Sequence, residues 1–148
     1  MEWVELWEKP VDQLAVLEKL GGPYAAQIRS AALQAHVPPR LVAAVAYIEN
    51  GRGNFRGAAH RVSPAGAIGV MQLMPSTAWN MLHVDPWDVR QNIEGAAKYL
   101  SYLLRQFHEN EKLAVMAYNA GPTAIARGYR PLQAVAYARQ VMRSMREI

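Results

Sequence analysis

One carboxylate ends an apolar run in this sequence, and its position suggests acid chemistry. Residues 41–48 read LVAAVAYI, and Glu49, Asn50 and Gly51 follow directly. A run with so few polar positions predicts a buried helix rather than an amphipathic one. A carboxylate at the helix C-terminus meets the negative end of the helix dipole, which costs about 0.3–1 kcal/mol. In a cleft, desolvation would add to this cost and raise the pKa of Glu49, as a general acid requires.

The alternative for Glu49 is an exposed carboxylate at a helix end, with no chemistry. Asn50 and Gly51 would then simply end the helix, because both residue types adopt the left-handed turn. Perturbed carboxylates also occur in structural settings. The spacing alone therefore leaves both interpretations open.

Residues 63–78, SPAGAIGVMQLMPSTA, form a second stretch that could contribute to a site. Its glycines and alanines have small side chains, so the backbone of this stretch can approach another group closely. Ser63, Met71 and Gln72 lie next to these small residues in the sequence. A tight turn followed by a helix with core methionines is the alternative interpretation, since Met commonly fills gaps in a core.

A third stretch, AYNAGP, places Tyr118 and Asn119 at the end of another apolar helix, just before Gly121 and Pro122 stop it. A phenol and an amide that are buried at a helix end are costly unless they find hydrogen-bond partners. Taken singly, each of these stretches is a weak signal.

The elements that must position these residues are almost all helical. Apolar residues recur at helical spacing, Asp88 is placed to cap a long helix, and residues 51–69 predict a long loop. The predicted helices are VDQLAVLEKLGG, PYAAQIRSAALQAH, the run that Pro38 and Pro39 open and Glu49 ends, MQLMPSTAWNMLH, VRQNIEGAAKYLSYLLRQFH, KLAVMAYNAGP and LQAVAYARQVMRSM. We therefore expect a mainly α chain with little or no β structure.

Composition narrows the function classes. The 148 residues suit one domain, and the absence of cysteine excludes disulfides, thiolate nucleophiles and cysteine-based zinc sites. The four histidines are far apart, so we expect neither a metal nor a cofactor. A net charge of +4 favours an anionic partner such as cell wall, acidic lipid or nucleic acid, without choosing among them. No apolar stretch approaches the roughly 20 residues that span a bilayer.

Four stretches, taken in order, resemble the lysozyme-like lytic transglycosylases, whose catalytic domain occurs in soluble lytic transglycosylases, in secretion and conjugation machines and in phage. The stretches are IEN, SPAGAIGVMQLMPSTA, NIEGAAKYL and AYNAGP. The resemblance runs from about residue 24 to about residue 141 and leaves residues 1–23 as an N-terminal helical extension of a single domain, 1–148. It implies a lysozyme-like fold of about seven to eight helices.

The resemblance also implies an activity and roles for particular residues. The activity is cleavage of the bond between N-acetylmuramic acid and N-acetylglucosamine in peptidoglycan, with a 1,6-anhydro product. Glu49 would act first as acid and then as base, because no second carboxylate is evidently aimed at it. The other implied roles are Ser63 beside the acid, Gln72 bonded to the glycan, Met71 against an N-acetyl group, Tyr118 and Asn119 orienting the acid or the sugar, and Tyr137 closing the cleft. Core packing alone stays an alternative for Met71 and Tyr137.

Three positions depart from the family pattern. Asn50 replaces the usual Ser after the catalytic Glu, and Val70 replaces a Leu in the core. Near the C-terminus the family pattern E-T-x-x-Y reads QAVAY, so Gln133 stands where a Glu is usual while Tyr137 is kept. A substrate contact through that carboxylate is therefore in doubt.

By resemblance the partners are peptidoglycan strands and a secretion, conjugation or phage complex, the location is the cell envelope or periplasm, and the chain is a monomer. The first residues, MEWVELWEK, are acidic where a signal peptide would be basic, so we expect a removed leader or another export route. The alternatives are a goose-type lysozyme that uses water, and an inactive glycan-binding scaffold of an envelope machine. A nucleic-acid module ranks last, because no base-reading helix stands out.

Overall fold

The computed structural model describes residues 13–148, and this part of the chain is built from α-helices joined by turns. Its seven α-helices are α2 (Leu14–Gly21), α3 (Ala25–Ala35), α4 (Pro39–Glu49), α5 (Val89–Gln106), α6 (Glu111–Ala120), α7 (Pro122–Ala126) and α8 (Leu132–Arg146). No strand occurs within residues 13–148, which contain isolated bridges at Val62–Ile68 and Ile68–Leu73. The mainly α prediction is confirmed. The first part of the predicted N-terminal extension, residues 1–12, lies outside the described residues.

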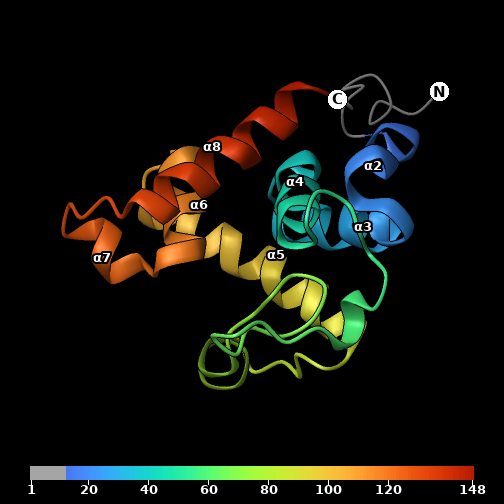
Figure 1. Ribbon diagram of the computed structural model, residues 1–148, viewed down its shortest axis with the longest axis horizontal. Coiled ribbons are helices and arrows are strands. Elements are labelled where there is room, and N and C mark those ends of the chain that lie inside the picture. Colours follow the sequence, from blue (N-terminus) through green and yellow to red (C-terminus); the bar gives the residue numbers. More distant parts are fainter. Residues whose placement is uncertain (1–12) are drawn as a thin grey trace.

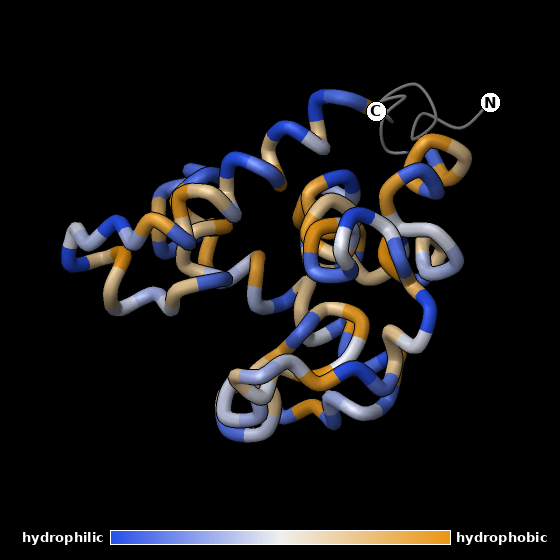
Figure 2. Tube along the Cα trace, in the orientation of Figure 1, coloured by the Kyte–Doolittle hydropathy of each residue, from blue (hydrophilic) through white to orange (hydrophobic). Residues whose placement is uncertain are grey.

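Helix α4 lies in the core and ends at Glu49, as the apolar run predicts. Its residues from Leu41 to Ala46 are completely buried, and it packs against α2, α3 and α8 (Figures 1 and 2). Pro39 occupies the first turn, where a missing backbone N–H costs nothing. Burial on all sides is what fixes the position of the last residue of this helix so firmly.

Helix α5 runs from the segment between α4 and α5 toward α6 (Figure 1). It begins as predicted, because the Asp88 carboxylate accepts a hydrogen bond of 2.9 Å from the Gln91 N–H. It packs against α3 and α6. Gly95 allows a close contact, since a Cβ at that position would lie 2.8 Å from Cγ2 of Val84. No helix of residues 13–148 is long and apolar enough to cross a membrane.

The segment between α4 and α5 contains the predicted loop, interrupted by a short 3-10 helix at Ala58–His60. The helix predicted over residues 71–83 is wrong in its first turn, because helical structure begins only at Pro75 and continues as a π-helix over Thr77–Leu82. Ile68 and Leu73 exchange backbone hydrogen bonds of 2.8 and 3.0 Å, and Gln72 has a φ of +54°. This tight turn excludes helical geometry before residue 74.

Helices α6 and α7 lie at one end of the molecule, and α8 extends from that end past α4 (Figure 1). Helix α6 starts at a cap in which the Asn110 side chain accepts from the Leu113 N–H at 3.0 Å, and it ends at Gly121, whose φ is +91°. The prediction missed α7, a single short helix that Pro122 opens. Helix α8 packs against both α4 and α6, which brings its first turns near the end of α4.

Candidate active site

Glu49 lines an open cavity of about 410 Å³ that four segments enclose. These segments are the end of α4, the turn around residues 63–74, the end of α6 and the start of α8. The lining residues are Glu49, Ser63, Pro64, Ala65, Ala67, Gln72, Met74, Tyr118, Asn119 and Gln133. The structure therefore brings together residues from three of the four stretches that the sequence singled out.

Two neighbouring cavities extend this space into a groove. One, of about 350 Å³, shares Gln72, Met74, Tyr118 and Asn119 with the cavity at Glu49 and continues to Tyr99. The other, of about 280 Å³, is also lined by Glu49 and leads to the loop that follows α4. Glu49 consequently lies where two cavities meet, as expected of a residue that acts on the middle of a long ligand.

The Glu49 carboxyl is shifted to a pKa of about 7 from its ordinary value of 4.5. Desolvation by burial is the main cause, and a hydrogen bond from Tyr137 opposes it. The Tyr137 hydroxyl donates to Oε2 of Glu49 at 2.7 Å. Tyr137 itself is 8% exposed and is not among the residues that line the cavities at Glu49, and its role in closing the cleft stays a prediction.

Tyr118 lines the groove and hydrogen-bonds to the turn that forms part of it. Its hydroxyl donates to the Met71 carbonyl at 2.6 Å, and its ring lies 5.6 Å from that of Tyr99. Burial and the nearby Glu49 carboxylate both raise the pKa of Tyr118 well above its ordinary value. Tyr118 is thus a neutral hydrogen-bond donor whose proton is already engaged with the turn at residue 71.

Ser63 and Gln72 also line the cavity, and both side chains bond to their own turn. The Ser63 hydroxyl accepts from the Ala67 N–H at 3.0 Å. The Gln72 amide donates to the carbonyls of Gly69 and Arg61 at 2.9 and 3.3 Å. These bonds shape the wall facing Glu49. The predicted contact of Gln72 with a glycan stays a prediction.

Asn119 and Gln133 offer polar groups of a different kind. Both line the cavity at Glu49, and neither side chain hydrogen-bonds to any group within residues 13–148. An amide offers donors and an acceptor together, which suits the hydroxyl and acetamido groups of a sugar. These two amides are therefore available for contacts with a ligand in the groove.

Met71, for which the resemblance implied a contact in the groove, lies in the core. Met74 lines the groove instead. Met71 is 0% exposed and does not line the cavities at Glu49, whereas Met74 is 41% exposed and lines two of them. The structure therefore favours core packing for Met71. The role of Met71 against an N-acetyl group was implied by the family resemblance, and the turn at Gln72, whose φ is +54°, separates this buried residue from Met74.

Two buried asparagines hold the site together, and sequence reasoning did not assign them a role. Asn50, 1% exposed, donates to the carbonyls of Ala46 and Val70 at 2.7 and 2.8 Å, and its own oxygen accepts from Arg61. It joins the end of α4 to the turn that carries Met71.

Asn92 plays the same part from α5. It donates to the carbonyls of Ile68 and Pro86 at 2.9 and 3.0 Å and accepts from the Met71 N–H at 2.9 Å. The signal for it was an amide on the apolar face of a long helix, since a buried amide requires several partners.

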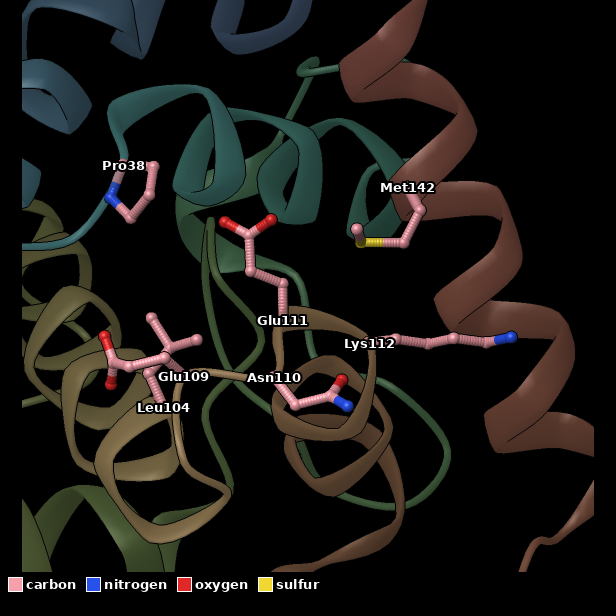
Figure 3. A pocket seen from close by; sticks show the side chains of 7 residues that line it. All are labelled: Pro38, Leu104, Glu109, Asn110, Glu111, Lys112 and Met142. Atoms are coloured by element: carbon pink, nitrogen blue, oxygen red, sulfur yellow. The ribbon is translucent and has the colours of Figure 1, made fainter.

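A further cavity of about 350 Å³ lies between the end of α5, the start of α6 and α8 (Figure 3). Glu109, Glu111, Lys112 and Met142 line it, and it shares no lining residue with the cavities at Glu49. No group of three or more His, Cys, Asp or Glu residues within residues 13–148 is arranged to hold a metal ion. The groove at Glu49 is therefore the candidate active site.

A helical domain with one buried, protonatable carboxylate in an open groove can support acid chemistry, and comparisons with known proteins show its family. The chain matches the transglycosylase SLT domain over residues 26–141 and belongs to this family. This confirms the resemblance and its extent.

Two curated relatives illustrate the family. The transglycosylase of Enterobacteria phage PRD1 is 38% identical over 94 residues, which are 64% of this chain and 33% of that protein. The soluble lytic murein transglycosylase of Escherichia coli K12 is 39% identical over 70 residues, 40% of this chain and 11% of that protein. The chain thus spans a third or less of the length of these relatives.

The fold agrees with solved structures of the same class. The soluble lytic transglycosylase SLT70 of Escherichia coli aligns with a TM-score of 0.72 at 24% identity, covering 95% of this chain and 25% of that one. An inactive mutant of lytic transglycosylase Slt from Pseudomonas aeruginosa aligns with the same TM-score, 0.72, at 22% identity over 93% of this chain and 25% of that one. At such identities the likeness establishes the shared fold.

Proposed function

We propose that this chain is a peptidoglycan lytic transglycosylase that cleaves the bond from N-acetylmuramic acid to N-acetylglucosamine and leaves a 1,6-anhydro end. The observation that carries the proposal is the Glu49 carboxyl, whose pKa of about 7 lets it give and take a proton near neutrality. Membership of the transglycosylase SLT domain family supports it. We also propose that the chain acts as one catalytic domain, as a monomer, and in the cell envelope.

The hydrogen bond from Tyr137 determines which oxygen delivers the proton. Oε2 of Glu49 accepts from the Tyr137 hydroxyl, so the proton of the acid form resides on Oε1. In the first step this proton passes to the glycosidic oxygen, the bond to the anomeric carbon breaks, and N-acetylglucosamine leaves with a hydroxyl group. Glu49 is then a carboxylate, and the hydrogen bond from Tyr137 stabilises it.

The second step needs a base beside the same carbon, and Glu49 is the carboxylate available. Among the described residues that line the three cavities, no other Asp or Glu occurs. The C6 hydroxyl of the muramic sugar attacks its own anomeric carbon, and its proton returns to Glu49. No water is consumed, and the enzyme regains its starting form. The N-acetyl group of the substrate can stabilise the cationic carbon between the steps, as in other substrate-assisted glycosidases.

The groove supplies contacts for the sugars on both sides of the bond. Its apolar side chains, such as Met74, offer surfaces for sugar rings, and the amides of Asn119 and Gln133 offer hydrogen bonds. Gln133 offers a neutral amide to the sugar where the family pattern has a Glu. Peptidoglycan strands are therefore the proposed partner, and we propose that the chain reaches them within a secretion, conjugation or phage complex.

The test is a digest of purified peptidoglycan followed by mass spectrometry of the muropeptides. We expect products with 1,6-anhydro ends, which resist borohydride reduction. We expect Glu49→Gln to lose turnover at least ~10³-fold while keeping the fold, because it removes the transferable proton. Glu94→Gln is the matched control, since Glu94 pairs with Arg90 on the surface of α5, away from the groove.

Other outcomes would contradict the proposal in distinct ways. Reducible ends would indicate a hydrolase of the goose-lysozyme type. Binding of peptidoglycan without any product would indicate a glycan-binding scaffold. Turnover by the Glu49→Gln variant would remove Glu49 from the mechanism.

A further inference from the structure

Arg61 lies beside the site, and the proposed mechanism makes no use of its charge. Its side chain lines the 280 Å³ cavity together with Glu49, Asn50, Gly51 and Asn54. The side chain is partly buried and donates to the Asn50 side chain and to the carbonyls of Asn54 and Arg56, the latter two at 3.1 and 3.0 Å. These three partners are all neutral, so the positive charge is solvated but not neutralised.

No carboxylate within residues 13–148 forms an ion pair with Arg61. A partly buried cation without an acid pays a desolvation penalty that neutral carbonyls offset incompletely. A guanidinium also has five N–H donors, and the three bonds to the protein leave at least two of them for another acceptor. Both the charge and the donors favour an anionic group of a ligand.

We propose that Arg61 binds a carboxylate on the lactyl and peptide branch of the muramic sugar. This inference rests on the proposed function and names the part of the substrate that the smaller cavity accepts. The sugar rings of the strand are uncharged, and its carboxylates are carried on that branch. Glu49 must lie at the anomeric carbon of the muramic sugar, and it lines the cavity of Arg61 as well, so the branch is within reach of the guanidinium.

The charge distribution along the groove supports this assignment. Among the described residues that line its three cavities, Arg61 is the one cation, while Arg52 and Arg56 are exposed in the same loop and line none of them. Gln133 also stands where the family pattern has a Glu, which leaves one carboxylate fewer to repel an acidic branch. Arg61 therefore selects for muramic sugars over uncharged ones.

The test compares ligands that differ in charge, in the Glu49→Gln background so that none is cleaved. The probes are the neutral chitin tetrasaccharide, a peptidoglycan tetrasaccharide with peptide stems, and the same tetrasaccharide after an amidase has removed the stems and freed the lactyl carboxylates. Calorimetry at low and high salt gives each affinity. We expect salt to weaken binding of the two anionic probes and not of the chitin probe.

Arg61→Gln then removes the charge and keeps an N–H donor for the Asn50 side chain. We expect it to weaken binding of an anionic probe by about tenfold, as for loss of a charge-assisted hydrogen bond, and to leave chitin binding unchanged. An effect on the stem-bearing probe places the bound carboxylate on the peptide, and an effect confined to the other anionic probe places it on the lactyl group. Arg56→Gln, the control from the same loop, should change neither affinity.

Equal losses for chitin and anionic probes in Arg61→Gln would show that Arg61 only shapes the loop, and would overturn the inference. A wild-type preference that is insensitive to salt would do the same without any Arg61 variant. If anhydro products form on peptidoglycan but Arg61→Gln affects chitin and anionic probes alike, Arg61 has no role in binding the carboxylate and the proposed function still stands. If no probe binds and no product forms, both fail.

Discussion

Removing the Tyr137 hydroxyl tests the electrostatic account of Glu49 directly. Tyr137→Phe deletes the donor that lies 2.7 Å from Oε2 of Glu49 and leaves the ring that packs in the core. This hydrogen bond lowers the pKa of Glu49, while desolvation holds that pKa at about 7. Without the bond, the anion loses stabilisation, and the pKa must rise further.

The magnitude follows from the bond energy. A hydrogen bond to a charged group contributes about 1.5–3 kcal/mol, and one pKa unit corresponds to about 1.4 kcal/mol. The protonated carboxyl also accepts a bond from Tyr137, so the lower end of the range applies. We expect the pKa of Glu49 to rise from about 7 to about 8 in Tyr137→Phe.

Two measurements check this value. The first is kcat/KM for peptidoglycan against pH, in which loss of the acid form sets the alkaline limb, so that limb should move up by about one unit. The second is a carbon NMR titration of the Glu49 carboxyl. Tyr102→Phe is the control, because Tyr102 is an exposed tyrosine of α5 that does not line the groove. An alkaline limb that stays in place or moves to lower pH would refute the reasoning.

Three further outcomes are expected. Glu49→Gln should have the same unfolding free energy as the wild type near pH 4 and exceed it by about 3 kcal/mol above pH 8. The reason is that the pKa of Glu49 is about 7 in the folded wild type and 4.5 in the unfolded chain, so the wild type loses stability as the pH rises between these values. Urea melts at several pH values measure this, and a difference that does not change with pH would contradict it. Asn92→Ala should lower the free energy of unfolding by about 2–3 kcal/mol, because it leaves two carbonyls and an N–H without the hydrogen bonds that Asn92 provides. The control Asn80→Ala, at an exposed position, should change the free energy of unfolding little in the same melts. Gln133→Glu should shift the alkaline limb of kcat/KM upward, because a second carboxylate would then line the cavity of Glu49; an unmoved limb would show that the two groups do not interact.

The sequence predicted the elements that depend on apolar period and on caps. The apolar run that Pro38 and Pro39 open predicted a buried helix, and Leu41–Ala46 are indeed buried in α4; Asp88 caps α5 through the N–H of Gln91. Both features are local, because they depend on residues within one or two turns of each other. The same is true of Gly121, which ends α6 where the sequence indicates.

The turn before residue 75 could not be predicted in this way. Its geometry depends on Asn92, which is distant in sequence and binds the carbonyl of Ile68 and the N–H of Met71. Gly69 is essential to the same contact, since a Cβ there would lie 2.5 Å from the Asn92 amide. The family resemblance placed Met71 against the glycan, whereas in the structure Met71 is buried and Met74 lines the groove.

The partner of Glu49 was likewise beyond the reach of spacing. Tyr137 is 88 residues away, and only the packing of α8 on α4 brings its hydroxyl to the carboxyl. The family pattern indicated that Tyr137 belongs to the site, yet its hydrogen bond to the Glu49 carboxyl came from the structure. A residue's membership of a site can thus follow from a motif while its role depends on the tertiary contacts.

The apolar surroundings of Glu49 explain both its raised pKa and the stability that the fold loses when Glu49 is ionised. The burial that makes α4 a core helix also desolvates the carboxyl at its end, so the acid is protonated near neutrality for the same reason that the helix is stable. A substitution at position 49 that relieves the buried charge must therefore stabilise the fold at alkaline pH and abolish proton transfer together. Asn50 limits how far the site can relax, because it ties the end of α4 to Val70 and to Arg61. Loosening that tie would admit water to Glu49 and lower its pKa, so that a smaller fraction of Glu49 would be protonated near neutrality and able to donate a proton.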